Sequence, residues 1–243
     1  MENINLKEML SKEYLLKDGV SDLEKKFDEI AEILLTKTKI VKGLQEYYIT
    51  DIEFYLYCKG HEDIITYPRK CYAGEWFFHD SGVDISFASN VEFKNGKAEL
   101  LDSSFFGGIL LRGIKLIKGG SVEKKELNDK PSNVFYELFR NFDAFCGNVE
   151  FPKLVKRGND EIITINNISE YSQPRKNLLS GYDTEDKINE IAKKEIFTQL
   201  VENKVLNISY NYNNKDTINT AEFHQHFKSY FAKPYRYTLK ESK

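Results

Sequence analysis

The residues best suited to chemistry lie in one stretch of the chain, between Tyr47 and Phe87. This stretch holds the only Trp, two of the three Cys and two of the four His, together with many aromatic and acidic residues. Glu53 is unusual there because apolar, β-forming residues surround it. A carboxylate in such a setting is either an exposed residue of an alternating strand or an acid held in a pocket for acid-base chemistry.

Several other residues could join Glu53 in such a site. Tyr55 lies two residues further on, so a strand places both side chains on the same face. Arg112 interrupts a second apolar segment, where it would form either a structural ion pair with Glu53 or part of a working site. The aromatic residues Phe77 and Phe78 are either core residues or walls that stack on a ligand.

Composition limits the classes of function. The chain has 243 residues, of which 41% are hydrophobic and 30% charged, and its formal net charge is -3. These values suit a soluble globular protein and give no general attraction to nucleic acid, although they allow a local basic patch. No apolar run approaches ~18 residues and the N-terminus lacks a signal-peptide pattern, so we expect no membrane association. Three cysteines without metal-site spacing suit a reducing cytoplasm.

Hydrophobic periodicity predicts helices around a set of strands. Residues 3–36 are expected to be helical, with Asn5 capping a first helix at 6–16 and Ser21 and Glu24 forming the capping box of a second. Strands are expected at residues 37–41, 47–57, 76–78, 83–88, 107–117, 206–212 and 235–239. The Asn95-Gly96 pair predicts a hairpin, and residues 160–168 resemble a strand pair. Further helices are expected at residues 131–145, 186–201 and 220–231.

The order of these elements indicates an α+β fold in which helices surround an antiparallel or mixed sheet, with a single domain over residues 1–243. No metal or cofactor is expected. His224 and His226 would face the same way only on a strand, and their segment is predicted to be helical. The glycine pairs at 107–108 and 119–120 lack the strand-to-helix context of a phosphate-binding loop.

Six short motifs, in the same order over most of the chain, resemble those of the alkyladenine (3-methyladenine) DNA glycosylase family. The first is Ile49-Thr50-Asp51-Ile52-Glu53-Phe54-Tyr55-Leu56, which is similar to a family strand reading Ile-Val-Glu-Thr-Glu-Ala-Tyr-Leu. The others are His61 with Tyr67-Pro68-Arg69, the run Trp76-Phe77-Phe78 with Gly82 and Asp84-Ile85-Ser86, Leu110-Leu111-Arg112-Gly113, Pro174-Arg175-Lys176-Asn177-Leu178 and Lys233-Pro234-Tyr235-Arg236-Tyr237-Thr238-Leu239. The resemblance implies a curved sheet of the alkyladenine DNA glycosylase type.

The resemblance also implies a reaction and roles for particular residues. Such enzymes extrude a nucleotide from duplex DNA and hydrolyse the N-glycosidic bond of a damaged, alkylated or deaminated, purine in base excision repair. Glu53 would activate a water and stabilise the oxocarbenium-like transition state, and Arg112 would help to hold that water. The residues matched to base contacts are Tyr55, His61, Phe78, Asp84 and Leu178. Those matched to phosphate or structural contacts are Arg69, Arg175, Lys233 and Arg236.

The chain also departs from the family. Where the family places a Tyr that wedges into the DNA minor groove, an ungapped alignment gives Ser81, whereas a gapped one matches Asp84 to a family Asn and puts Phe77 at the wedge. The strongly basic character is missing, and residues 180–231 form a long polar insertion. The same pocket would therefore suit a second class, a binding protein or scavenger for a free nucleobase, nucleoside or small nucleotide. A third reading is an interaction protein whose pocket is vestigial.

Overall fold

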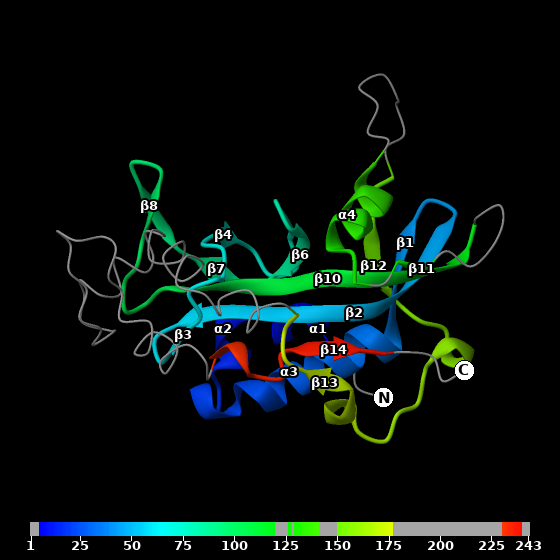
Figure 1. Cartoon of the computed structure of the whole chain (residues 1–243), viewed down its shortest axis with the longest axis horizontal. Coiled ribbons are helices and arrows are strands. Elements are labelled where there is room, and N and C mark those ends of the chain that lie inside the picture. The colour runs from blue at the N-terminus through cyan, green and yellow to red at the C-terminus, as the bar shows by residue number, and fades with distance from the viewer. Residues whose placement is uncertain (1–4, 120–125, 128, 141–149, 177–229, 240–243) are drawn as a thin grey trace.

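Two long antiparallel strands, β2 (Gln45–Cys58) and β10 (Phe105–Lys118), form the centre of a large sheet (Figure 1). They appear in a computed structural model that describes residues 5–119, 126–127, 129–140, 150–176 and 230–239. Both strands are rich in β-branched and aromatic residues, which fit a half-buried pleated surface. The fold is a single mixed α+β body with few helices, which agrees with the predicted class.

The strand order of the main sheet is β12-β1-β2-β10-β6-β5, and every pairing is antiparallel. The flanking strands are β1 (Thr38–Lys42), β5 (Trp76–His79), β6 (Gly82–Ser86) and β12 (Lys153–Lys156). Short strands extend this sheet: β3 (His61–Glu62), β11 (Glu126–Leu127), β13 (Ser172–Gln173) and β14 (Arg236–Thr238). Two small hairpin-like sheets pair β4 (Lys70–Cys71) with β7 (Ser89–Asn90) and β8 (Glu92–Lys94) with β9 (Lys97–Glu99).

Strand β2 positions the candidate site because it has neighbours on both edges along most of its length. On one edge it pairs with β10, and on the other with β1, β14 and β3 in turn. A central strand of this kind has no free backbone groups, so its side chains are held at fixed positions. Residues on its two faces alternate, and the odd-numbered face of β2 carries Asp51, Glu53 and Tyr55.

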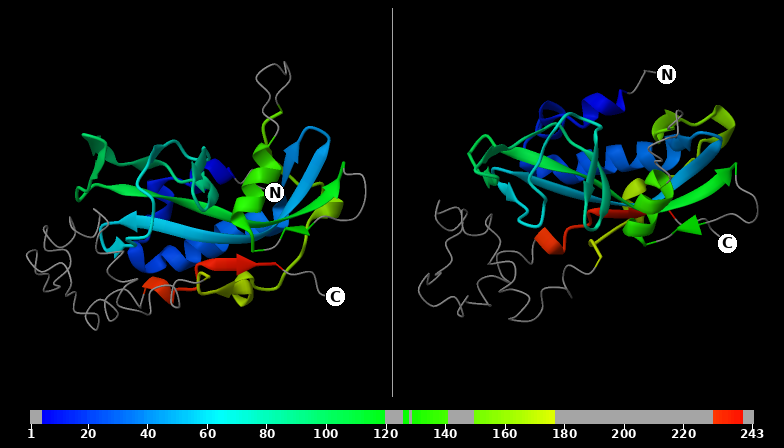
Figure 2. Two further views of the ribbon diagram at one scale, coloured as in Figure 1. Left: turned by 45° about the horizontal axis from the view of Figure 1, so that its top comes forward. Right: turned by 90° about the horizontal axis from the view of Figure 1, so that it is seen from above.

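The N-terminal helices cover one face of the sheet, as Figures 1 and 2 show. They are α1 (Leu6–Met9), α2 (Lys12–Leu15), a 3-10 turn at Val20–Asp22, and α3 (Leu23–Glu32), which continues as a π-helical turn at Ile33–Lys37. Phe27 of α3 stacks on Phe54 of β2 with 4.4 Å between ring centroids, and it meets Tyr235 edge-on at 4.8 Å. The helix α4 (Pro131–Phe139) packs against β6 and β10. Two 3-10 turns, Asn159–Glu161 and Ile168–Tyr171, complete the described elements.

The main strands confirm the predicted ones to within a few residues, and the Asn95-Gly96 hairpin is confirmed. Both of its central residues have positive φ angles, 52° and 78°, as a tight primed turn requires. The closing strand predicted at 235–239 is present as β14. These segments share strong alternation or specific turn chemistry, and both are local signals.

Some local predictions were wrong. The single helix expected at 6–16 is broken, because the Ser11 side chain accepts a hydrogen bond from the Tyr14 amide and starts a second helix. The capping box of Ser21 and Glu24 is absent, since a 3-10 turn leads into α3 at Leu23. Residues 160–168 form no strand, because the Glu161 carboxylate accepts from the Gly158 amide and closes a 3-10 turn there.

Several predictions lie wholly or largely outside the described residues. They concern residues 141–145 of the helix predicted at 131–145, the helix at 186–201, the strand at 206–212, most of the helix at 220–231, and most of the polar insertion at 180–231. The helix predicted at 131–145 was too long, because it ends at Phe139 and Arg140 is already extended. Within the ranges that the structure describes, no helix combines the length and the apolar character needed to cross a membrane.

Candidate functional site

Glu53 lies at the centre of the sheet and is fully buried, with 0% of its surface exposed. On the two neighbouring strands, Leu110 of β10 and Arg236 of β14 stand directly opposite Glu53. Directly opposed residues of antiparallel strands share a face, so Glu53 stands in a row with these two side chains. Of the two alternatives for this acid, the structure excludes an exposed residue on an alternating strand.

Three donors hold the Glu53 carboxylate. The Tyr55 hydroxyl donates to Oε2 at 2.7 Å, and an Arg112 guanidinium nitrogen lies 3.1 Å from the same oxygen. The Lys176 backbone amide donates to Oε1 at 2.7 Å. Tyr55 and Arg112 thus lie beside Glu53, as the shared strand face and the second apolar strand predicted, whereas their matched roles as a base contact and a water-holding group stay predictions.

Arg112 lies two residues after Leu110, on the face of β10 that meets Glu53, and at an irregularity of this strand. The register between β10 and β2 shifts between Leu111 and Gly113, so Arg112 is an extra residue opposite Asp51. Such a bulge re-aims a side chain and increases the local twist. Gly113 fits beside it because a Cβ atom there would lie only 2.6 Å from the Thr50 hydroxyl.

Tyr55 serves as a donor and its ring face is already covered. Burial, and after it the charge of Glu53, raises the pKa of the Tyr55 hydroxyl well above its usual range, so the group stays protonated and donates. The Arg175 guanidinium lies over the ring, 4.7 Å from its centroid. Arg175 is itself paired with Asp63 at 2.5 Å, and both side chains are fully buried. The Tyr55 ring therefore has an arginine over one of its faces.

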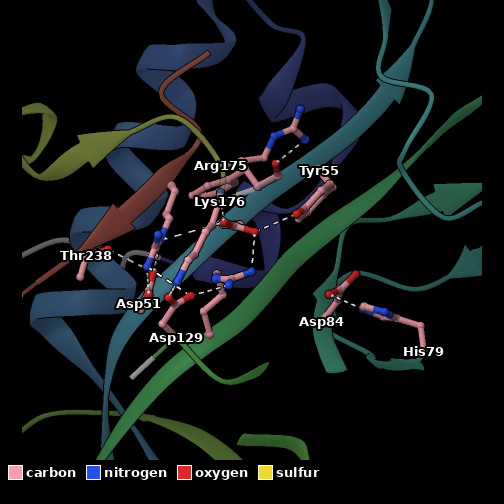
Figure 3. A network of polar contacts seen from close by, with 12 residues as sticks. Asp51, Tyr55, His79, Asp84, Asp129, Arg175, Lys176 and Thr238 are labelled. Carbon is pink, nitrogen blue, oxygen red and sulfur yellow. Dashed lines mark hydrogen bonds and ion pairs between the residues drawn. The ribbon is translucent and has the colours of Figure 1, made fainter. Parts of the chain in front are cut away.

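The charges around Glu53 extend into a network, shown in Figure 3. Arg236 binds Asp51 through two nitrogen-oxygen contacts of 3.0 and 2.6 Å. Arg112 contacts Asp129 at 2.5 Å, and the Lys176 ammonium also pairs with Asp129. The network joins β2, β10 and β14 to the segment before α4 and to the segment after β13.

A second acidic group lies on the same face, one strand away. Asp84 of β6 stands opposite Leu110, which in turn stands opposite Glu53. Its carboxylate pairs with Arg69 at 2.7 Å and with the His79 Nε2 atom at 2.9 Å. Figure 3 shows Asp84 and His79 apart from the network around Asp51, with β10 running between them.

Arg69 is held as a structural side chain. Its guanidinium lies 3.8 Å from the centroid of Phe77 and is almost fully buried. Gly108 makes room for it, because a Cβ atom at that position would lie 2.8 Å from an Arg69 nitrogen. Arg69 therefore offers its charge to Asp84 and not to a phosphate at the surface.

Two residues matched to base contacts lie elsewhere. His61 is buried; its Nδ1 atom is 2.8 Å from the Leu56 carbonyl and its Nε2 atom is 2.9 Å from the Tyr235 hydroxyl. The carbonyl can only accept, so Nδ1 carries the hydrogen and Nε2 accepts from Tyr235. Phe78 is 51% exposed and packs edge-on against Phe139 of α4. Within the described residues, no hydrogen bond, ion pair or ring contact joins either side chain to Glu53.

The remaining predicted residues have mixed outcomes. Lys233 pairs with Glu24 at 2.8 Å near the surface, whereas Arg236 joins the Glu53 network. Leu178 lies outside the described residues. Sequence reasoning gave no role to Asp129, or to Lys176, whose contact with Glu53 is made by its backbone amide. No local pattern marks either residue.

Other ligand-binding features are few. Within the described ranges, no group of three or more His, Cys, Asp or Glu side chains could hold a metal ion. A separate pocket of about 400 Å³ lies at the far end of β2 and β10, lined in part by Tyr48, Lys115 and Arg157. None of the residues predicted for the site lines it.

Comparisons with known proteins give little guidance. No protein-family profile matches the chain, and no solved structure matches it. The uncharacterized protein L759 of Acanthamoeba polyphaga mimivirus is 25% identical over 143 residues. That match covers 53% of this chain and 64% of the viral protein, so the chain spans slightly less than two thirds of its relative. The chain is thus similar to a protein whose printed name assigns no activity.

Proposed function

We propose that this protein hydrolyses the N-glycosidic bond of a damaged purine base in double-stranded DNA. The observation that carries the proposal is the enclosed Glu53 carboxylate, held by Tyr55 and Arg112 on the polar face of the sheet. An oriented anion of this kind can activate a water and stabilise an oxocarbenium-like transition state. The six motifs that resemble the alkyladenine DNA glycosylase family support the same reaction and a sheet of that family's type.

Glu53, Leu110 and Asp84 form a row across β10, and because they are only 0%, 3% and 2% exposed, a base would reach this row only after the side chains that cover it move aside. Glu53 and Asp84 flank Leu110 on one face, and two strand spacings separate them by about 10 Å. A purine ring over Leu110 would place its glycosidic bond toward Glu53 and its base edge toward Asp84. An aspartate accepts hydrogen bonds from exocyclic amino groups, so Asp84 would read the base.

To activate a water, the Glu53 carboxylate must give up one of its present hydrogen bonds. Both carboxylate oxygens already accept hydrogen bonds in this structure. A reacting water would replace the Lys176 amide on Oε1, while Tyr55 and Arg112 keep Oε2 in place. The Tyr55 hydroxyl then acts as a positioning group, since its ring face is covered by Arg175.

A second function from a different class is binding of a free purine, nucleoside or small nucleotide. The formal net charge of -3 favours it, because duplex DNA binding depends on excess positive charge. The main cations of the network are also paired: Arg236 with Asp51 and Arg175 with Asp63. A neutral ligand would meet no electrostatic penalty at such a site.

Base release from defined DNA duplexes tests the leading proposal. Duplexes that each carry one alkylated or deaminated purine are incubated with the wild type, Glu53→Gln and Glu99→Gln. The wild type and the exposed control Glu99→Gln should release the base equally, and Glu53→Gln should be slower by about 10²- to 10⁴-fold. Absence of release by the wild type, or equal rates for both variants, would overturn the proposal for those lesions. A purine ligand found by mass spectrometry of the purified protein would instead support the second function.

A further inference from the structure

Asp129 is the meeting point of three cations from three separate segments. Arg112 of β10 lies 2.5 Å from its carboxylate, Lys176 pairs with it, and Arg236 of β14 lies 3.6 Å away. The backbone of Asp129 has a φ angle of 54°, a left-handed conformation that non-glycine residues adopt at some energetic cost. The segment before α4 therefore presents this acid to the cations in an uncommon conformation.

The charges balance only while Asp129 is in place. The three cations Arg112, Lys176 and Arg236 face three acids, which are Asp51, Glu53 and Asp129. The side chains of Asp51 and Glu53 are 1% and 0% exposed, whereas that of Asp129 is 24% exposed. Asp129 is thus the acid that can leave, and its departure uncovers one surplus positive charge.

We propose that Asp129 occupies an anion site, and that a phosphate of the substrate displaces it. A phosphodiester carries one negative charge and so restores the balance. Arginine forks and a lysine ammonium are the side chains that bind phosphate oxygens best. This inference rests on the proposed function, because the phosphate beside the extruded nucleotide would then lie next to Glu53.

The displacement leaves the Glu53 site intact. The donors to Glu53 are the Tyr55 hydroxyl, Arg112 and the Lys176 amide, and none of them belongs to the segment that carries Asp129. Until a phosphate arrives, Asp129 blocks the site and keeps it closed to other anions. The site is in this sense self-inhibited.

Binding of a phosphate-containing probe without a base tests the proposal. The first probe is a duplex with a tetrahydrofuran abasic-site analogue, followed by fluorescence anisotropy. Asp129→Asn should bind it about tenfold more tightly than the wild type. The matched control is Asp102→Asn, which makes the same charge change where Asp102 is 83% exposed and pairs with Lys59. Its affinity should stay within about twofold of the wild type.

A second substitution keeps the test decisive if Asp129→Asn folds poorly. Lys176→Gln removes one cation of the site, so it should weaken probe binding several-fold relative to the wild type. Added to Asp129→Asn, it should abolish the tenfold tighter binding of that variant. The proposal is overturned if Asp129→Asn binds neither this duplex nor deoxyadenosine monophosphate more tightly than Asp102→Asn does. It is overturned equally if Lys176→Gln leaves affinity unchanged.

A second probe separates the two sources of phosphate. Deoxyadenosine monophosphate is titrated into the same variants by calorimetry. If Asp129→Asn binds the mononucleotide more tightly than the wild type does, but not the duplex, the result supports the anion site and argues against DNA as the substrate. If Asp129→Asn binds the duplex more tightly but the wild type releases no base in the glycosylase assay, the result supports the anion site and contradicts the proposed reaction.

Discussion

At the scale of single residues, the side chains around Glu53 divide into those that hold it and those that are held elsewhere. The contact between Glu53, Tyr55 and Arg112 could be predicted, because alternation places two of them on one face and an apolar neighbouring strand can supply the third. The partners of His61 could not be predicted, because a histidine near a loop has several hydrogen-bonding groups within reach. Its ring nitrogens bind the Leu56 carbonyl and the Tyr235 hydroxyl, which is 174 positions away.

Removing the Tyr55 hydroxyl should weaken the Glu53 site without disturbing the packing. We expect Tyr55→Phe to lower the free energy of unfolding by about 1.5 to 3 kcal/mol, because one hydrogen bond to a buried charge is lost. Base release should fall by about tenfold, since the carboxylate is held less firmly. Tyr57→Phe, two residues further along the same face, is the matched control and should change both values little. Urea unfolding and single-turnover base release measure the two effects, and full activity of Tyr55→Phe would contradict the assigned role.

His61 should make the protein less stable in mild acid. Burial lowers the pKa of its imidazole, and Asp63 opposes only part of that shift. On acidification the unfolded chain therefore takes up the proton first, so stability is present above about pH 6.5 and falls below it. Between about pH 6.5 and 5.5 the wild type should lose up to about 1 kcal/mol more than His61→Gln. Denaturant titrations at both pH values measure the difference, and parallel losses would argue against it.

At the scale of elements, the strands were easier to predict than the turns between them. β2 and β10 have long runs of β-forming residues, and the Asn95-Gly96 pair specifies its hairpin. The helix breaks near Ser11 and the 3-10 turn at Asn159–Glu161 depend on single side-chain bonds, which compete with several equivalent local choices. The bulge at Arg112 leaves no pattern in the sequence.

The close pairing of β10 and β2 depends on glycine at one position. A Cβ atom at Gly107 would lie 2.1 Å from the Tyr55 carbonyl oxygen, so Gly107→Ala must displace the strand beside the site. We expect a loss of about 3 kcal/mol in the free energy of unfolding. Gly74→Ala is the control, because no atom lies within 4 Å of its added carbon and only its φ of +81° opposes the change. That variant should lose about 1 kcal/mol, and equal losses in urea unfolding would refute the steric explanation.

At the scale of the whole molecule, the site is assembled from parts far apart in the sequence. Arg175 joins Asp63 across 112 positions, and the Lys176 amide reaches Glu53 across 123. Such partners could not be predicted from the sequence, because neither periodicity nor spacing records which loops meet. The class of fold could be predicted, because it depends on the number and type of elements.

The buried pair of Arg175 and Asp63 should be essential as a pair. We expect Asp63→Asn to lower the free energy of unfolding by about 3 to 5 kcal/mol, because it leaves the Arg175 charge buried without a partner. Combining it with Arg175→Met should recover part of that loss. Chemical denaturation of the two single variants and the double variant measures the coupling, and additive losses would show that the two side chains act independently.

The pairing of β14 with β2 also determines at which stage of folding the Glu53 site forms. Arg236 and Asp51 are 185 positions apart, so the loop between them must close before their ion pair forms. Contacts of such long range form late, after the hairpins and local helices. A partly folded chain would therefore have its sheet core but not the complete electrostatic surroundings of Glu53. The ion pairs that surround this carboxylate are therefore expected to be complete only in chains that have finished folding.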